Sequence, residues 1–375
     1  MNLNHIYHGD ALEILKTLPD NSVDCGVTSP PYYGLRDYGV DGQIGLEESP
    51  EEYINRLVSV FREFRRVLKP EGTLWVNIGD SYVGTGGDRK NPVSNKIFNQ
   101  QQQSNPKDGR YQRTQTLKEG GLKPKDLMGI PWLLAFALRA DGWYLRQDIV
   151  WNKPNPMPES VTDRCTKSHE YIFLFSKSAH YYYDNEAIKE PCIQDEMANG
   201  FRGGSYCNNE TFKNEIGGKR KSKGNYRPPA GWDTEPGSHG TIHRDGRAVR
   251  YGGNKYTANP DEFYRTKSEN AYEPREKLNK RSVWTVATQA YKEAHFATFP
   301  EELIKPCILA GSPEGGIVLD MFFGSGTTGK VALNNFRHYI GIELNPKYIE
   351  LANKRLEVHK SQMDMFSFGV DRIIV

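Results

Sequence analysis

Short apolar runs alternate with segments of helical periodicity along most of this chain. An apolar run at 23–27 is typical of a buried strand, and a second one covers 73–78. Between them, apolar residues recur at helical spacing over 50–69, after a capping Ser49 and with Glu52 placed to complete a capping box. Residues 69–72 would end that helix. This part of the chain therefore predicts a strand, a loop, a helix and a second strand.

The same alternation returns later in the chain. It predicts helices at 126–140, 300–310 and 327–335, strands at 144–151, 170–175, 316–321 and 338–342, and a last helix that begins at Asn345-Pro346. Strands that alternate with helices in this way indicate an α/β fold, with a doubly wound, mainly parallel sheet covered by helices on both faces.

Two long segments interrupt this rhythm and are poor in aliphatic residues. Lys and Arg outnumber Asp and Glu by nine to three over 84–125, and by ten to four over 213–255, within the second segment, 190–282. Loops of this length are either functional or disordered. Because the formal net charge of the whole chain is only +2, any surface for a polyanion must be local.

Composition narrows the class of protein further. A chain of 375 residues can bury a sizeable core. Its five cysteines form no Cys-x-x-Cys pair, which argues against a disulfide framework and a structural zinc site, so we expect no metal ion. No apolar run approaches the roughly 20 residues that span a bilayer, and the N-terminus lacks the pattern of a secretory signal. We expect a cytoplasmic protein with no membrane partner.

A glycine loop follows the strand expected at 316–321 and opens the next helix. Gly324 and Gly326 allow a ligand to approach the backbone closely, beyond the carboxyl end of a strand, where nucleotide-like ligands bind in open α/β sheets. Glu343 ends the next strand, 23 residues after Asp320, where a carboxylate can accept both hydroxyls of a ribose. The spacing fits an adenosyl ligand, although a purely structural turn stays open.

A phosphate-binding P-loop is the rival interpretation of this segment. Residues 324–330 satisfy the Gly-x-x-x-x-Gly-Lys skeleton of such a loop. The residue after the lysine is Val331, where a P-loop needs Ser or Thr to hold magnesium. The match therefore fails at the metal-binding position.

A second motif, Thr28-Ser29-Pro30-Pro31-Tyr32, leaves the strand expected at 23–27. Its two prolines have no N–H and hold the backbone rigid. An exocyclic base amine is a weak nucleophile, and hydrogen bonds to the Ser29 hydroxyl and the Pro30 carbonyl would aim its lone pair at a sulfonium methyl group. Tyr32 offers a flat face for a base flipped out of a duplex, a contact worth about 1–3 kcal/mol. Pro-Pro-Tyr by itself is equally typical of a rigid turn with a packed aromatic.

Together, the motif at 28–32 and the loop at 320–326 resemble the DNA amino-methyltransferases, which make N4-methylcytosine or N6-methyladenine. Their order along the chain resembles the β class of that family, and the resemblance covers 5–83, 126–183 and 295–358. It implies a Rossmann-like, circularly permuted methyltransferase fold that uses S-adenosylmethionine. It also implies double-stranded DNA as partner, together with a cognate restriction endonuclease that acts on the same site, in a bacterial, archaeal or phage-encoded system. A monomer and a homodimer both stay open.

The resemblance also assigns roles to individual residues. Ser29, Pro30, Pro31 and Tyr32 would be catalytic. The cofactor would be bound by Asp10, Phe299, Pro300, Asp320, Phe322, Gly324, Gly326, Thr327 and Glu343, and the flipped base by Tyr33, Trp151, Lys153 and His169. Two of these have ordinary alternatives, since Asp10 could be a helix cap and His169 a structural histidine.

The family pattern also suggests how the chain divides and which base it modifies. Segment 1–83 would be the catalytic half, 84–125 a basic insertion, 126–189 the continued methyltransferase domain, 190–282 the target-recognition region and 283–375 the cofactor half. The candidate DNA contacts within 190–282 are Lys219, Arg220, Lys221, Arg227, Arg247 and Arg250. Ser29 favours cytosine N4 over adenine N6. Three alternatives remain. The first is the same methyl transfer to RNA or to a protein amide. The others are a nucleotide-hydrolysing protein and a protein that only binds DNA.

Overall fold

The computed structural model describes residues 1–35, 39–83, 121–191, 277–289 and 299–357. The chain forms two compact units, one of Met1–Lys189 with Asn279–Val375 and one of Glu190–Leu278. In the second unit, the described residues form the two-stranded antiparallel pair β6 (Glu190–Pro191) and β7 (Lys277–Leu278). All the elements below belong to the first unit.

The first unit is built on an eight-stranded sheet in the order β1-β10-β9-β2-β3-β5-β4-β8. The strands are β1 (His5–His8), β2 (Val23–Thr28), β3 (Leu68–Ile78), β4 (Tyr144–Asn152), β5 (His169–Ser176), β8 (Val283–Thr285), β9 (Ile317–Asp320) and β10 (His338–Glu343). Every pair is parallel except β3 with β5 and β5 with β4. The expected α/β fold with a mainly parallel sheet is confirmed.

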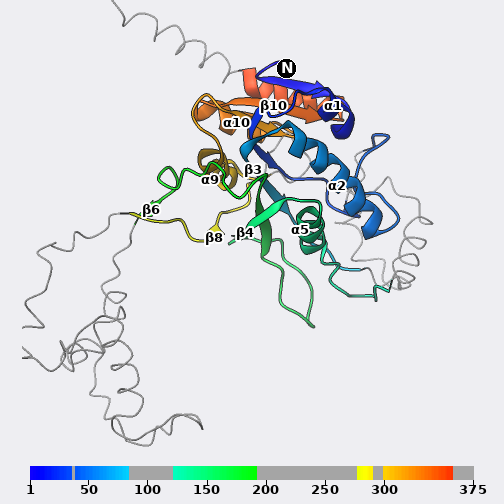
Figure 1. Ribbon diagram of the computed structural model, residues 1–375. Coiled ribbons are helices and arrows are strands. Elements are labelled where there is room, and N and C mark those ends of the chain that lie inside the picture. Colours follow the sequence, from blue (N-terminus) through cyan, green and yellow to red (C-terminus); the bar gives the residue numbers. More distant parts are fainter. Residues whose placement is uncertain (36–38, 84–120, 192–276, 290–298, 358–375) are drawn as a thin grey trace, which may run out of the picture. The chain divides into compact units, whose positions relative to one another are not determined.

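Helices pack on both faces of this sheet (Figure 1). They are α1 (Ala11–Thr17), α2 (Pro50–Val67), α5 (Ile130–Ala140), α9 (Glu301–Gly311), α10 (Thr327–Asn334) and a last helix that includes 346–357. Residues of α1, α2 and α5 share one apolar cluster, and residues of α9, α10 and the last helix share another. The strands serve both clusters by alternation: in β3, Leu74 and Val76 face the first, and Trp75 faces the second.

The end of α2 differs from the expectation. The helix begins as predicted, with the Ser49 side chain accepting from the Glu52 N–H at 3.2 Å. It ends at Val67, and residues 68–72 belong to β3, not to a turn. The pairing of β2 with β3 shifts between Val23 and Cys25, so residues 69–72 form an irregularity within the strand, held by an ion pair between Lys69 and Asp24 at 2.7 Å.

The start of α5 also differs, because the helix begins at Ile130 and not at 126. Asp126 lies in a turn, where its carboxylate accepts from the Lys123 N–H at 2.8 Å. The first N–H groups of the helix are capped from far away in the chain: Asp80 accepts from Gly129 and from Ile130, each at 3.1 Å. A cap supplied by a distant residue leaves no local signal. The short β1 and α1 are further elements that the pattern did not predict.

Candidate active site

The candidate residues lie at one edge of the sheet. The parallel strands β1, β10, β9, β2 and β3 end there with their carboxyl termini. Because β5 is antiparallel to β3, with Tyr171 opposite Ile78, its first residues lie at the same edge. The last residues of β4 join them, with Asn152 opposite His169. This edge therefore collects the two motifs and the residues expected to flank the base.

Asp320, at the end of β9, joins the two motifs directly. The Thr28 hydroxyl donates to one of its carboxylate oxygens at 2.6 Å, and the Thr328 hydroxyl donates to the other at 2.6 Å. The Phe322 N–H adds a third bond at 3.0 Å. Asp320 is only 1% exposed, and burial raises the pKa of its carboxyl to about 6 against these three bonds.

The hydrogen bonds and the burial of Asp320 give it a structural role, while the cofactor contact expected of it stays a prediction. Both carboxylate oxygens accept from donors within the protein, and the side chain is buried. Asp320 is therefore placed to hold the glycine loop against the end of β2.

The glycine loop has a backbone conformation that favours glycine. Gly324 and Gly326 adopt positive φ angles of 51° and 81°. Apart from the two chain neighbours of Gly324, no atom of the described residues lies within 4 Å of a Cβ placed there, so this part of the structure leaves space for a ligand. The Gly324 N–H donates to Glu343 at 2.7 Å, and the Asn345 N–H donates to the other Glu343 oxygen at 2.8 Å. Burial raises the pKa of Glu343, which is half-buried at this edge.

The last helix secures the loop through Arg355. Its guanidinium donates to the Ser325 carbonyl at 3.3 Å, to the Thr327 hydroxyl at 3.0 Å and to Glu301 at 2.9 Å. Thr327 is 4% exposed, so this hydroxyl faces the protein interior and not the space in front of the loop, which corrects the expectation that it lines a ligand.

Lys330 provides the geometric test of the P-loop alternative. Its ammonium pairs with Glu301 at 2.8 Å. Burial opposes ionisation of Glu301, but the contacts with Lys330 and Arg355 prevail and lower the pKa of this carboxyl. The lysine of the apparent phosphate-binding skeleton is thus held by a carboxylate of α9.

The other expected cofactor residues lie around this loop. Phe322 and Phe299 are half-buried and pack against the two apolar clusters, and Pro300 is buried in the N-cap position of α9. Asp10 follows β1 and caps α1, accepting from Leu12 N–H at 2.9 Å and from Glu13 N–H at 3.2 Å. The helix-cap alternative for Asp10 is therefore observed, while a cofactor contact stays a prediction.

The motif at 28–32 leaves β2 as expected and is held rigidly. Thr28 and Pro30 are buried, and Ser29, Pro31 and Tyr32 are half-buried. The Tyr53 hydroxyl of α2 donates to the Pro31 carbonyl at 2.8 Å. Packing thus adds to the stiffness of the two prolines.

The Tyr32 hydroxyl reaches across the edge to β5. It donates to Glu170 at 2.7 Å, and Asn77 of β3 lies 3.4 Å from the same hydroxyl. Burial, together with the charge of Glu170, raises the pKa of Tyr32 well above its ordinary value. Tyr32 is therefore a neutral hydrogen-bond donor at physiological pH.

The residues expected to face the base divide into two groups. Tyr33 is 2% exposed and donates to the Glu48 carbonyl at 3.1 Å, so it is a core residue and not a base contact. Trp151 is 4% exposed and donates to the Val286 carbonyl at 2.8 Å, which corrects its role in the same way. Lys153 pairs with Glu170, and His169 is half-buried, edge-on to Tyr171. Both remain at the edge as candidates.

Two residues that shape the site were not singled out from the sequence. Asn77 and Arg355 each act on a motif that lies far away in the chain. Glu170 had a signal, because the family resemblance places it with His169 and Tyr171 beside the flipped base, but its bond to Tyr32 was not predicted. The predicted DNA contacts Lys219, Arg220, Lys221, Arg227, Arg247 and Arg250 lie outside the described residues.

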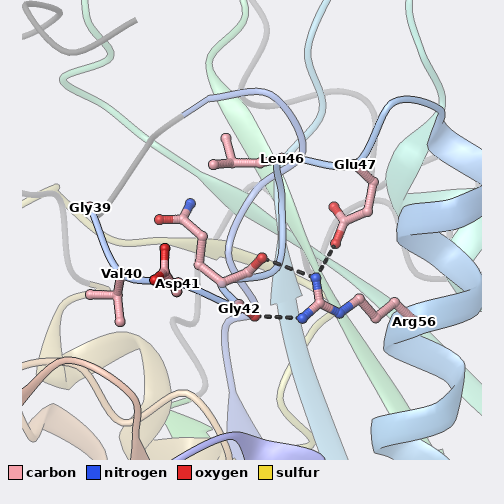
Figure 2. A pocket seen from close by; sticks show the side chains of 8 residues that line it. Gly39, Val40, Asp41, Gly42, Leu46, Glu47 and Arg56 are labelled. Carbon is pink, nitrogen blue, oxygen red and sulfur yellow. Dashed lines mark hydrogen bonds and ion pairs between the residues drawn. The ribbon is translucent and has the colours of Figure 1, made fainter.

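A pocket of about 550 Å³ lies beside the loop that follows the motif at 28–32 (Figure 2). It is lined by Gly39, Val40, Asp41, Gly42, Gln43, Leu46, Glu47 and Arg56. The Arg56 guanidinium donates to the Gln43 carbonyl and to Glu47, each at 3.1 Å, and also to the Gly42 carbonyl. Arg56 of α2 therefore uses these hydrogen bonds to hold the loop against the helix.

The described part of the chain can be searched for metal sites and for helices that could span a membrane. Among those residues, no group of three His, Cys, Asp or Glu side chains could hold a metal ion. Of the helices that the structure describes, none has both the length and the apolar character needed to cross a bilayer.

Comparison with known proteins points to one family. A family model described as DNA methylase, for N6 and N4 methyltransferases, matches residues 23–354. The type II methyltransferase M.Cfr9I of Citrobacter freundii is 44% identical over 94% of this chain and 87% of its own length. The type II methyltransferase M.SmaI of Serratia marcescens is 41% identical over 93% of this chain and 89% of its own.

Solved structures support the same fold. A candidate DNA modification methylase of Thermus thermophilus, complexed with S-adenosyl-L-methionine, matches with a TM-score of 0.50 and 21% identity, covering 95% of this chain and 94% of that one. The PvuII DNA methyltransferase, described as cytosine-N4-specific, matches with a TM-score of 0.52 and 16% identity, covering 94% and 86%. At such identities the likeness concerns the fold alone.

Proposed function

The chain belongs to the DNA methylase family of N6 and N4 amino-methyltransferases, and we propose that it methylates the N4 amine of a cytosine flipped out of double-stranded DNA, with S-adenosyl-L-methionine as methyl donor. The observation that carries this proposal is the bond between Thr28 and Asp320 at 2.6 Å, which fixes the catalytic motif beside the glycine loop.

The residues around the glycine loop fit the methyl donor. The open space at Gly324 admits a close ligand, and Glu343 presents a half-buried carboxylate next to it. A ribose hydroxyl can donate to a carboxylate that already accepts one backbone N–H on each oxygen, because each oxygen has a second lone pair. When bound, S-adenosyl-L-methionine supplies a methyl group on a sulfonium centre.

The catalytic motif supplies positioning, not a nucleophile. The Ser29 hydroxyl and the Pro30 carbonyl would each accept one hydrogen of the base amine and so direct its lone pair. The stiff backbone between Thr28 and Pro31, held at both ends by hydrogen bonds, limits the freedom of these two acceptors. As the amine takes the methyl group it gains positive charge, which the same two oxygens stabilise until a proton leaves. Tyr32 would stack on the base.

Cytosine is favoured over adenine by Ser29, since a serine at this position is more typical of the cytosine-N4 members of the family. N6-adenine is the alternative, because a hydroxyl can accept a hydrogen bond from either amine. In the cell, the enzyme would act in the cytoplasm and protect DNA from a cognate restriction endonuclease, as the type II relatives suggest.

The product identifies the function. The protein is incubated with isotope-labelled S-adenosyl-L-methionine and unmethylated genomic DNA, and the digested nucleosides are separated and identified by mass and retention against standards. We expect N4-methylcytosine. N6-methyladenine would overturn the base assignment, 5-methylcytosine would overturn amine methylation, and label in RNA or protein but not in DNA would overturn the proposal as a whole.

A matched pair of variants tests whether methylation depends on Ser29 at this edge of the sheet. Ser29→Ala removes the hydroxyl that accepts the amine hydrogen and should lower the yield strongly. Ser22→Ala changes the same residue type just before β2 begins, at the opposite end of that strand, where the hydroxyl donates to the Pro19 carbonyl at 2.8 Å. This second variant should match the unmodified protein.

A further inference from the structure

We infer that Glu170 is a positioning residue for methyl transfer, which holds the Tyr32 ring in place through its hydroxyl so that one face of the ring meets the flipped base. The inference rests on the proposed function, because it assumes that Tyr32 stacks on the base. Nothing in the sequence motifs or the family match assigns this role to Glu170.

The contacts of Glu170 join β5 to Asn77 of β3 and to the segments that follow β2 and β4. One carboxylate oxygen accepts from the Tyr32 hydroxyl at 2.7 Å and from the Asn77 amide at 3.3 Å. The other oxygen pairs with the Lys153 ammonium. Asn77 is itself oriented by a bond from its amide to the Tyr171 carbonyl at 3.1 Å. The Tyr32 hydroxyl is therefore part of a hydrogen-bond network in which the sheet holds Glu170 and Asn77 in place.

The Tyr32 ring is also confined sideways by Gly79, which follows β3. A Cβ at Gly79 would lie 2.8 Å from Cε2 of Tyr32 and 3.3 Å from the Glu170 carboxyl carbon. Such a distance is too short for any real side chain, so the ring and Glu170 occupy the space that glycine leaves. The ring is held at its tip by Glu170 and along one side by the backbone.

Lys153 balances the charge of Glu170 and is itself anchored. Its ammonium lies 4.3 Å from the centroid of the Trp151 ring, and the Trp151 indole donates to the Val286 carbonyl at 2.8 Å. The side chains of Lys153 and Glu170 are 18% and 16% exposed. Two residues first expected to touch the base, Trp151 and Lys153, thus form the support behind Glu170.

This arrangement favours positioning over direct contact with the base. Both oxygens of Glu170 already have partners, and its side chain is largely buried. Tyr32 stays protonated, so its hydroxyl is a constant donor to the carboxylate. Restricting an aromatic platform before the base arrives lowers the cost of orienting the base, and a misplacement of about 1 Å can cost roughly a hundredfold in rate.

A double-mutant cycle tests the inference. Single-turnover methylation of DNA is measured at saturating S-adenosyl-L-methionine for the unmodified protein, Glu170→Ala, Tyr32→Phe and the double variant, along with the affinity for S-adenosyl-L-methionine. We expect Glu170→Ala to slow the transfer by about 10- to 100-fold with unchanged affinity. In the Tyr32→Phe background, where no hydroxyl remains to be held, the same substitution should change the rate far less.

Two further variants separate positioning from general stability. Glu170→Gln keeps an oxygen that accepts from the Tyr32 hydroxyl and should retain most of the rate, although it loses the ion pair with Lys153. Glu159→Ala is the matched control, because Glu159 also forms an ion pair, with Arg164 at 2.6 Å, in the loop between β4 and β5. It should leave the rate unchanged.

Three results would contradict the positioning role or the function on which it rests. An equal loss from Glu170→Ala in both backgrounds would mean that Glu170 acts without Tyr32. No loss, or a loss as large for Glu170→Gln as for Glu170→Ala, would remove the positioning role. If the unmodified protein transfers no methyl group to DNA, the proposed function fails instead, so the two failures are distinct.

Discussion

The motif at 28–32 is held at each end by a carboxylate, and the two carboxylates have different surroundings. Asp320 accepts from Thr28 at the start of the motif, is 1% exposed and has only neutral donors around it. Glu170 accepts from Tyr32 at its end, at a half-buried position, and is paired with Lys153. The first joins the motif to the glycine loop, and the second joins it to the strands β5 and β4.

This difference indicates that the two sides of the edge have separate roles. On the glycine-loop side, geometry depends on buried hydrogen bonds and on glycine conformation, so changes there should act on cofactor affinity and on stability. On the Tyr32 side, geometry depends on a network near the surface, so changes there should act on the rate of transfer.

The largest effect on cofactor affinity is expected on the glycine-loop side, for Gly324→Ala. Its Cβ would meet no described residue other than its chain neighbours, so the added methyl group enters the space proposed for the cofactor. We expect the affinity for S-adenosyl-L-methionine to fall by about tenfold or more, a change of at least roughly 1.4 kcal/mol, as measured by calorimetry.

Gly315→Ala is the matched control for that variant. Gly315 also has a positive φ, 74°, with no protein atom near a Cβ, but it lies before β9 and away from the loop. It carries the same backbone strain without the ligand. If both variants lose the same affinity, the loss reflects backbone strain, and the cofactor does not approach Gly324.

A smaller effect concerns the pH dependence of stability, through Asp320. The pKa of its carboxyl is raised from 3.8 to about 6 in the folded protein, so between these values the folded state binds more protons than the unfolded chain. Stability from this group is therefore gained as the pH falls through 6 and lost as it rises. From pH 7 to pH 5 the gain is about 1 kcal/mol.

Asp320→Asn isolates this contribution. Asparagine keeps an oxygen for the Phe322 N–H and does not titrate. Unfolding by urea at pH 5 and pH 7 should show that the unmodified protein gains about 1 kcal/mol relative to the variant at the lower pH. A difference that stays constant with pH would show that Asp320 titrates normally.

The smallest effect is expected at Asp10, where two roles can be separated. Asp10→Ala removes the cap of α1 and should cost about 1 kcal/mol of stability in urea unfolding. Asp10→Asn keeps a capping oxygen and removes the charge. If Asp10 also contacts the cofactor, Asp10→Asn should weaken cofactor binding while stability is preserved; an unchanged affinity would leave the cap as its role.

Much of this fold could be predicted because its signals are local. Apolar runs and capping residues placed β2, α2, β9 and α10 close to their observed bounds. The pattern failed where the cause is distant: α5 begins four residues later than expected because Asp80, about 50 positions earlier, caps it. The sequence also singled out the glycine loop and the motif at 28–32, but not the bond that joins them across 292 positions.

The expected base contacts show a second kind of limit. Tyr33 and Trp151 were assigned from the resemblance to the family, yet both side chains are buried. Neighbours on a strand or a tight loop point in opposite directions, and no sequence pattern here fixed which of them faces the core. Lys153 lies at the expected edge, with a carboxylate as its partner that the sequence did not reveal.

Tyr32→Ala tests most directly whether Tyr32 supports the flipped base while the glycine loop binds the cofactor. Single-turnover methylation of DNA and the affinity for S-adenosyl-L-methionine are measured for the same protein preparation. Because the stacking platform is lost and the glycine loop is untouched, we predict a rate lower by about 5- to 150-fold, equivalent to 1–3 kcal/mol, with unchanged cofactor affinity. An equal loss of both would contradict the claim, since Tyr32 would then support the edge as a whole and not the base.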